Sequence, residues 1–99
     1  MNRDIKRTIE KALRKPCGDL GELIKKYYAE TEPDKGVIIR RFYFEGRGFW
    51  ATMRELRRCG FYMAKTTFYR LKDEIIADIA MRACYEHLIC PYRDEMQQK

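Results

Sequence analysis

The chain has 99 residues, of which 45% are hydrophobic and 36% are charged, and its formal net charge is +6. This length fits one domain, residues 1–99, because two domains of half the length would each be too small to bury a core. There is no apolar run near the ~20 residues of a membrane span and no secretory signal, so we expect a cytoplasmic protein that does not enter the membrane.

Helical periodicity dominates the sequence and predicts an all-α fold, a small bundle of about five helices. The first expected helix covers residues 3–15, and Ile9 and Leu13 lie on its apolar face. Pro16 and Gly18 then interrupt the pattern, as residues that end helices do.

The second expected helix starts at Asp19, which we interpret as its N-cap, with Glu22 at the position of a capping-box acid. It ends near Pro33. The next segment, Val37–Phe44, is rich in β-branched and aromatic residues, which favours a strand, but its spacing also fits a helix face. We predict a helix there, ending at Gly46.

Two more helices complete the expected bundle. The fourth opens at Phe49 and ends at Gly60, where a backbone with positive φ is easily accommodated. The last and longest helix has Thr66 or Thr67 as its N-cap and extends toward Pro91, which leaves a loose tail over residues 91–99. Its apolar stripe consists of Phe68, Leu71, Ile75 and Ile79.

The four cysteines are Cys17, Cys59, Cys84 and Cys90, and the last two flank the only histidine, His87. Their spacing matches neither a zinc finger nor a paired motif. We therefore expect reduced, buried thiols, no metal site and no cofactor.

The positive charge is concentrated in one third of the chain. The segment from Arg40 to Lys72 contains nine cations and two anions, whereas the rest of the chain has slightly more anions than cations. Seven of these nine cations are arginines, whose planar fork suits phosphates and guanine edges. This concentration favours a polyanionic partner over a merely solvated face.

Two helices separated by a glycine, with hydroxyl and basic residues opening the second, predict a helix-turn-helix over about residues 48–80. In such a motif the start of the second helix reaches base edges in the major groove of double-stranded DNA. The expected base contacts are Thr66, Thr67, Tyr69 and Arg70. The expected backbone contacts are Arg47, Arg54, Arg57, Arg58, Lys65 and Lys72. Contact is expected to end at Asp73 and Glu74, interpreted as a solvated acidic face.

The segment Ala64–Leu71, after Met53–Leu56 and Gly60, resembles the helix-turn-helix of sigma-factor region four. More narrowly, it is similar to phage late-gene transcription regulators of the ArpU and RinA type, in which a helix rich in Ile, Arg and Tyr precedes the motif, as residues 38–46 do here. The resemblance covers about residues 37–80. It implies DNA binding at a promoter and makes RNA polymerase a candidate partner. Gly60 to Phe68 is longer than the usual spacing, which keeps a small terminase-type DNA-packaging protein as an alternative.

Other functions have weaker support in the sequence. It has no Gly-rich phosphate loop or nucleophile motif, so we expect no enzymatic activity. The main rival is a protein-interaction module, because the last helix continues with apolar residues on several sides, which we interpret as a homodimer surface: Met81, Cys84, Tyr85, Leu88 and Ile89. The aromatic cluster of Phe42, Tyr43, Phe44, Phe49 and Trp50 is expected in the core.

Overall fold

The computed structural model describes residues 3–88, and this part of the chain contains helices and no strand. The helices are α1 (Arg3–Arg14), α2 (Gly18–Glu30), α3 (Pro33–Ile38), the π-helix η1 (Ile39–Phe44), α4 (Phe49–Arg58) and α5 (Lys65–Tyr85). The prediction of a small all-α bundle is confirmed. Within the described range, no helix is both long and apolar enough to cross a bilayer. The expected tail, Pro91, Ile89 and Cys90 lie outside the described residues.

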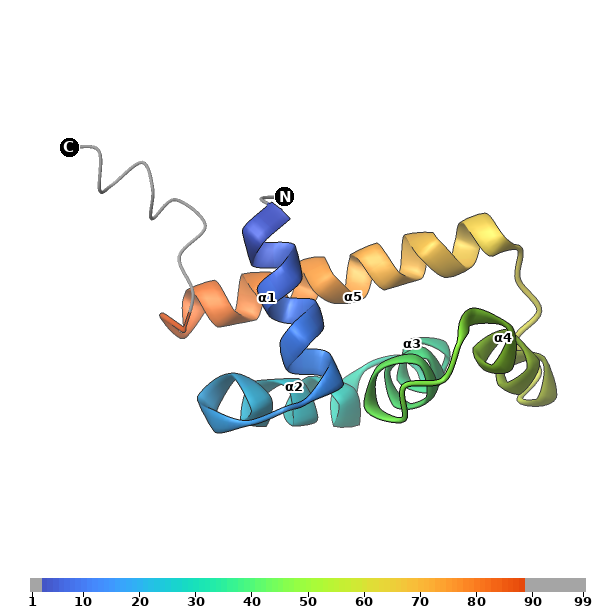
Figure 1. Ribbon diagram of the computed structural model, residues 1–99, viewed down its shortest axis with the longest axis horizontal. Helices are drawn as coiled ribbons and strands as arrows, with labels where there is room; N and C mark the ends of the chain where they lie inside the picture. Colours follow the sequence, from blue (N-terminus) through green and yellow to red (C-terminus); the bar gives the residue numbers. More distant parts are fainter. Residues whose placement is uncertain (1–2, 89–99) are drawn as a thin grey trace.

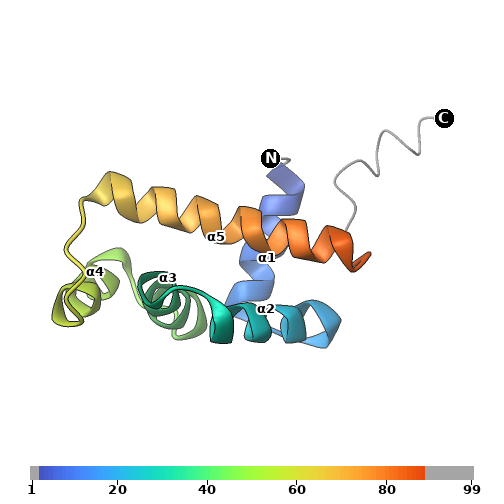
Figure 2. The ribbon, with the colours of Figure 1, turned by 180° about the vertical axis from the view of Figure 1, so that it is seen from behind.

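The long helix α5 extends along the molecule, which measures 51 × 25 × 20 Å (Figure 1). Helices α2, α3 and α4 form a second layer beside it, and α1 crosses α5 (Figure 2). Helix α4 lies at the end of the molecule where α5 begins, and α2 lies toward the opposite end.

The core fills the space between these two layers. The stripe predicted for α5 is buried, with Phe68, Ile75 and Ile79 fully enclosed and Leu71 nearly so. Residues from α1, α2, α3, η1 and α4 complete the core, among them Ile9, Leu13, Ile24, Ile38, Ile39, Tyr43 and Leu56. Burial of these side chains holds the helices together, because each helix has only one apolar face.

The ambiguous segment is helical, which confirms the prediction over the strand alternative. Helix α3 begins with Pro33 in its first turn and continues directly into η1. The amide of Glu45 bonds to the carbonyl of Arg40 at 2.9 Å, the wider spacing of a π-turn. Ile39 and Tyr43 in η1 are both buried.

The helix starts differ from the predictions. Helix α2 follows Cys17, whose extended backbone makes it the N-cap, so Asp19 lies inside the first turn. Helix α5 follows Ala64 for the same reason, and Thr66 and Thr67 lie in its first turn. Neither N-cap residue makes a side-chain cap bond. These boundaries are set by where the incoming chain turns, which residue preference alone does not fix.

The far end of α5 also differs from the prediction, because the helix ends well before Pro91. His87 has a φ of +60°, and its amide bonds to the carbonyl of Cys84 at 3.1 Å. The amide of Leu88 bonds to the carbonyl of Ala83 at 2.8 Å. These are the two hydrogen bonds of a Schellman motif, with His87 at the left-handed position.

Stability should fall as the pH rises above about 10, the ordinary pKa of tyrosine. Burial raises the pKa of Tyr43, whose hydroxyl donates to Glu10 at 3.3 Å. Burial also raises the pKa of Tyr27, whose hydroxyl donates to Asp78. A group with a raised folded-state pKa stabilises fully below its unfolded pKa, and this contribution is lost as the pH rises through the folded value.

Tyr43→Phe removes one of these groups, so we expect its free energy of unfolding to fall less steeply between pH 9 and 11.5 than that of the wild type. Urea unfolding followed by circular dichroism at several pH values measures this slope. Parallel profiles for the two proteins would show that Tyr43 does not carry the effect.

Candidate nucleic-acid interface

A tight turn after α4 sets the direction in which the chain approaches α5. Gly60 has a φ of +91°, as expected from the sequence. The amide of Gly60 donates to the carbonyl of Arg57 at 3.0 Å, and the amide of Phe61 donates to the carbonyl of Leu56 at 2.8 Å. This is a Schellman motif in which a side chain at residue 60 would be strained. The chain then reaches α5 through an open connector, residues 61–64.

A cluster of aromatic rings joins the start of α5 to α4 and η1. The buried ring of Phe68 lies 4.9 Å from that of Phe49 and 5.7 Å from that of Phe42, measured between centroids. The ring of Tyr69 stacks parallel to that of Phe49 at 5.8 Å. These contacts fix the orientation of the first two turns of α5, and therefore of the face that they present to solvent.

The exposed face of these turns contains most of the residues predicted to contact bases. Thr66, Tyr69 and Arg70 are exposed, and Lys65 lies beside them at the helix start. Together they line an open surface that continues to Asp73, Glu74 and Ala77. Thr67 is only half-exposed and lies about 100° around the helix from Thr66. The structure therefore brings three of the four predicted base contacts onto one face.

Lys72 borders this face on the side of Tyr69, but its charge is already engaged. It is half-buried, and its ammonium lies 4.4 Å from the ring centroid of Phe42 and 5.2 Å from that of Tyr69. Burial lowers the pKa of this ammonium below its ordinary value. The rings of Phe42 and Tyr69 hold the charge by cation–π contact, so Lys72 is not grouped with the other predicted backbone contacts.

The arginines on and near α4 form two groups. Arg47 and Arg58 are bound in a network in which Glu45 accepts from Arg47 at 2.9 Å and Glu55 accepts from Arg58 at 2.8 Å. Arg41 connects the two carboxylates, at 2.8 Å from Glu45 and 2.7 Å from Glu55. The hydrogen bond from Arg58 lowers the pKa of Glu55, and that from Arg47 lowers the pKa of Glu45. Both carboxylates therefore stay ionised and hold these guanidinium groups in place.

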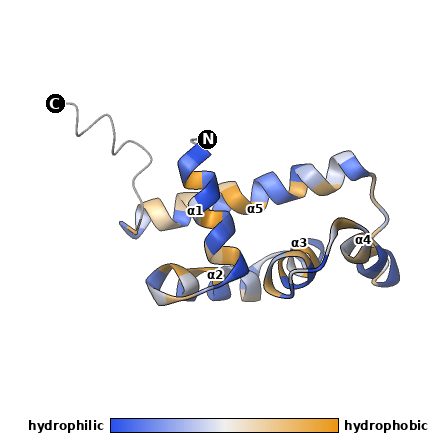
Figure 3. Cartoon of the chain, viewed as in Figure 1, coloured by the Kyte–Doolittle hydropathy of each residue, from blue (hydrophilic) through white to orange (hydrophobic). Residues whose placement is uncertain are grey.

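Arg54 and Arg57 make up the second group. Both side chains are exposed, and neither forms an ion pair among the residues that the structure describes. Arg54 also lines a hollow of about 290 Å³ together with the network residues Arg41, Arg47, Glu55 and Arg58. Figure 3 shows hydrophilic residues on the outer side of α4, as on the outer sides of the other helices. This end of the molecule therefore presents cations available to an external anion.

Acidic residues bound the exposed face of α5. Asp73 is exposed, as expected, and lies 3.7 Å from the ammonium of Lys6. Glu74 is half-buried, so it belongs to the expected solvated acidic face only in part. Its carboxylate holds the buried ammonium of Lys35 at 3.2 Å and contacts the guanidinium of Arg70 at 3.4 Å. The side chain of Glu74 faces α3, where it pairs with Lys35, and this contact explains its partial burial.

Two expectations from the sequence are wrong in a way that changes the surface. The first is that Trp50 was expected in the core, whereas it is 76% exposed. Tyr62, for which there was no prediction, is also exposed, at 77%. Phe49 and Trp50 are neighbours on α4, about 100° apart, and Phe49 takes the inward position.

The second is that the thiols were expected to be buried, whereas Cys17 and Cys59 are exposed at helix ends. Within residues 3–88, no three His, Cys, Asp or Glu side chains are grouped to hold a metal ion.

Comparisons of this chain with protein-family models, with curated proteins and with solved structures find no match.

Proposed function

We propose that this protein is a sequence-specific DNA-binding protein, a transcription regulator of phage or prophage type that inserts the start of α5 into the major groove. One observation carries the proposal. Lys65, Thr66, Tyr69 and Arg70 share an exposed face at the N-terminal end of a helix held by the Phe68 ring cluster. A rigid helix end with outward polar side chains is what major-groove recognition requires.

The chemistry of this face assigns a role to each side chain. Arg70 has the length and the planar fork to bond O6 and N7 of a guanine. Its contact with Glu74 is long at 3.4 Å and exposed, so exchanging it for a base edge costs little. The N-terminal amides of α5, near Thr66, attract a phosphate. Asp73 repels phosphates one turn further on, so the groove contact ends there.

The arginines on and just before α4 supply the contacts that do not depend on the DNA sequence. Arg54 and Arg57 are free to neutralise phosphates, while Arg47 and Arg58 are positioned by Glu45 and Glu55. Each phosphate neutralised releases counterions, so affinity should fall steeply with salt.

The double variant Arg54→Ala/Arg57→Ala tests this proposal. We expect it to bind all duplex sequences more weakly and to lower the slope of log K against log salt concentration by about 2, close to 0.9 for each phosphate lost. Fluorescence anisotropy with a labelled duplex between 50 and 300 mM salt measures both quantities.

Lys26→Ala is the matched control, because Lys26 is an exposed cation on α2, toward the other end of the molecule. It should leave the salt slope unchanged. If duplex DNA does not bind at low salt, or if Lys26→Ala lowers the slope as much as the double variant, the proposed interface is wrong.

We further propose that the far end of α5 forms a homodimer. Met81 is 64% exposed and Tyr85 is 82% exposed, and the partly exposed Cys84 lies between them. A second copy would cover these apolar side chains without touching the start of α5. This surface also supports the alternative that the protein is an interaction module, for which RNA polymerase is the candidate partner named by the resemblance.

Sedimentation velocity over a range of concentrations tests the dimer. We expect a dimer at micromolar concentrations, and dissociation to monomers in Met81→Glu/Tyr85→Glu, because charges would have to be buried in the interface. A wild-type protein that remains monomeric at high micromolar concentration would remove this proposal.

A further inference from the structure

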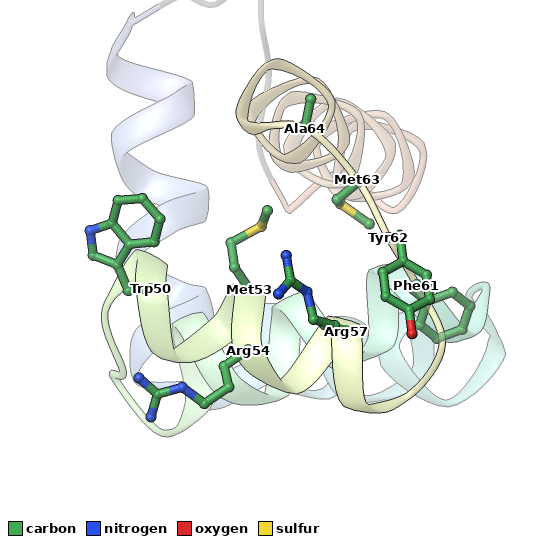
Figure 4. A pocket seen from close by; sticks show the side chains of 8 residues that line it. All are labelled: Trp50, Met53, Arg54, Arg57, Phe61, Tyr62, Met63 and Ala64. Atoms are coloured by element: carbon green, nitrogen blue, oxygen red, sulfur yellow. The ribbon is translucent and has the colours of Figure 1, made fainter.

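A cleft lies between α4 and the connector that precedes α5 (Figure 4). Its volume is about 570 Å³, within the size range of small-ligand sites. Its lining combines aromatic and apolar side chains with two guanidinium groups, and consists of Trp50, Met53, Arg54, Arg57, Phe61, Tyr62, Met63 and Ala64.

Aromatic rings stand at both ends of this cleft. Figure 4 shows Trp50 at one end of α4 and Tyr62 on the connector at the other, with Arg57 between them. Both rings are about three-quarters exposed, whereas most other large rings among residues 3–88 are buried or half-buried, with Tyr69 and Tyr85 as the exceptions. The ring centroids of Phe49 and Trp50 lie 4.9 Å apart, and this contact leaves most of the surface of Trp50 exposed to solvent.

The cleft is also cationic. Arg54 and Arg57 are its charged lining residues, and neither has an ion-pair partner among residues 3–88. Glu55 on the same helix faces Arg41 and Arg58 instead, so it does not neutralise the cleft. In Figure 4 the guanidinium of Arg57 points into the cleft, whereas the side chain of Arg54 extends away from it along the outer side of α4. The site therefore offers two planar apolar surfaces, one unpaired positive charge inside the depression and a second at its edge.

We propose that this cleft binds single-stranded nucleic acid, with bases stacked on Trp50 and Tyr62 and backbone phosphates held by Arg57 inside the cleft and by Arg54 at its edge. Exposed rings beside a cationic groove are the combination that such binding uses, because every base has a flat face and every linkage carries a negative charge. Ala64, the N-cap of α5, lines the same cleft, so a strand bound there lies next to the proposed duplex face. The inference stands on the cleft itself and does not require duplex recognition by Arg70.

An acidic peptide would satisfy the two arginines but not the rings. Peptide-binding grooves use pockets that enclose apolar side chains, whereas the two rings here line only the ends of the cleft and keep most of their surface exposed. Stacking, by contrast, needs only an accessible ring face. The exposure of both rings therefore favours the nucleic acid.

Trp50 is the only tryptophan in the chain, so its fluorescence reports directly on this site. We expect the single-stranded oligonucleotide dT12 to quench this fluorescence in a salt-dependent titration. Tyr62→Ala should weaken binding on the order of tenfold, the loss expected when one stacked base is removed. Tyr62→Phe keeps the ring and should bind like the wild type. Because Tyr62 is exposed, these variants should unfold at nearly the wild-type temperature.

Three controls separate the outcomes. A dT12-length strand of abasic sugar-phosphate should bind much more weakly, because it offers charge without bases. Poly-glutamate of similar length should not quench Trp50. Arg70→Ala should bind dT12 normally, whatever it does to duplex binding, so failure of the duplex proposal stays distinguishable from failure of this one.

The proposal is overturned if dT12 does not quench Trp50, or if Tyr62→Ala binds as tightly as the wild type. Equal binding of the abasic strand would reduce the site to a non-specific charge patch. Binding of poly-glutamate with Trp50 quenching would assign the cleft to an acidic protein segment instead.

Discussion

Replacing Phe68 with alanine should lower the free energy of unfolding by about 3–5 kcal/mol. Phe68 is fully buried, and its ring contacts those of Phe42, Phe49 and Tyr69. Removing it leaves a cavity at the point where α4, η1 and α5 meet, and these rings cannot close it without moving the helices. Because a domain of this size is stable by only ~5–15 kcal/mol, this is a large share of the total.

Urea unfolding followed by circular dichroism measures the effect, and loss of a cooperative transition at 25 °C also fulfils the prediction. Lys26→Ala is the control, since Lys26 is exposed on α2 and outside both proposed surfaces, and it should change stability by less than about 0.5 kcal/mol. A loss below about 1 kcal/mol in Phe68→Ala would mean that the ring cluster does not hold the start of α5.

The sequence was sufficient to predict the elements whose apolar pattern repeats over several turns. The stripe Phe68–Ile79 could be recognised because its spacing matches one helix face, and the structure buries it as predicted. The positive φ at Gly60 was predictable for the same local reason, since a glycine after a helix favours that turn. Local pattern does not determine which of two adjacent aromatics faces inward, and the choice between Phe49 and Trp50 depends on how α4 packs against α5.

The candidate interface was predictable in part. The helical wheel placed Thr66, Tyr69 and Arg70 opposite the buried stripe, and the structure exposes all three. The helical wheel did not separate the paired arginines from the unpaired ones. Glu55 lies within one turn of Arg58 on α4, but it also pairs with Arg41 of η1, a contact that only the tertiary fold creates. Nor did the wheel place Lys72, whose ammonium lies over the ring of Phe42, which reaches it only through the tertiary fold. Tertiary contacts thus decide which members of a basic segment are available to a ligand.

Arg70→Ala should reduce discrimination between the preferred duplex and a scrambled one by about 1–3 kcal/mol, if Arg70 bonds a guanine edge as proposed. A selection of bound fragments from random duplex DNA first identifies the preferred sequence. Anisotropy titrations of the wild type and the variant on both duplexes then give the two affinities for each protein. The loss should fall on the preferred duplex, because a scrambled duplex gains nothing from this side chain beyond its charge.

The double variant Arg54→Ala/Arg57→Ala is the informative comparison, because its loss should be nearly equal on the two duplexes. Arg70→Lys refines the test, since it keeps the charge but loses the bidentate fork, and it should resemble Arg70→Ala in discrimination and the wild type in salt slope. If Arg70→Ala discriminates between the two duplexes as well as the wild type does, sequence recognition must come from other residues of α5. Equal loss on both duplexes would instead make Arg70 a phosphate contact, and α5 would then bind DNA without reading it at this position.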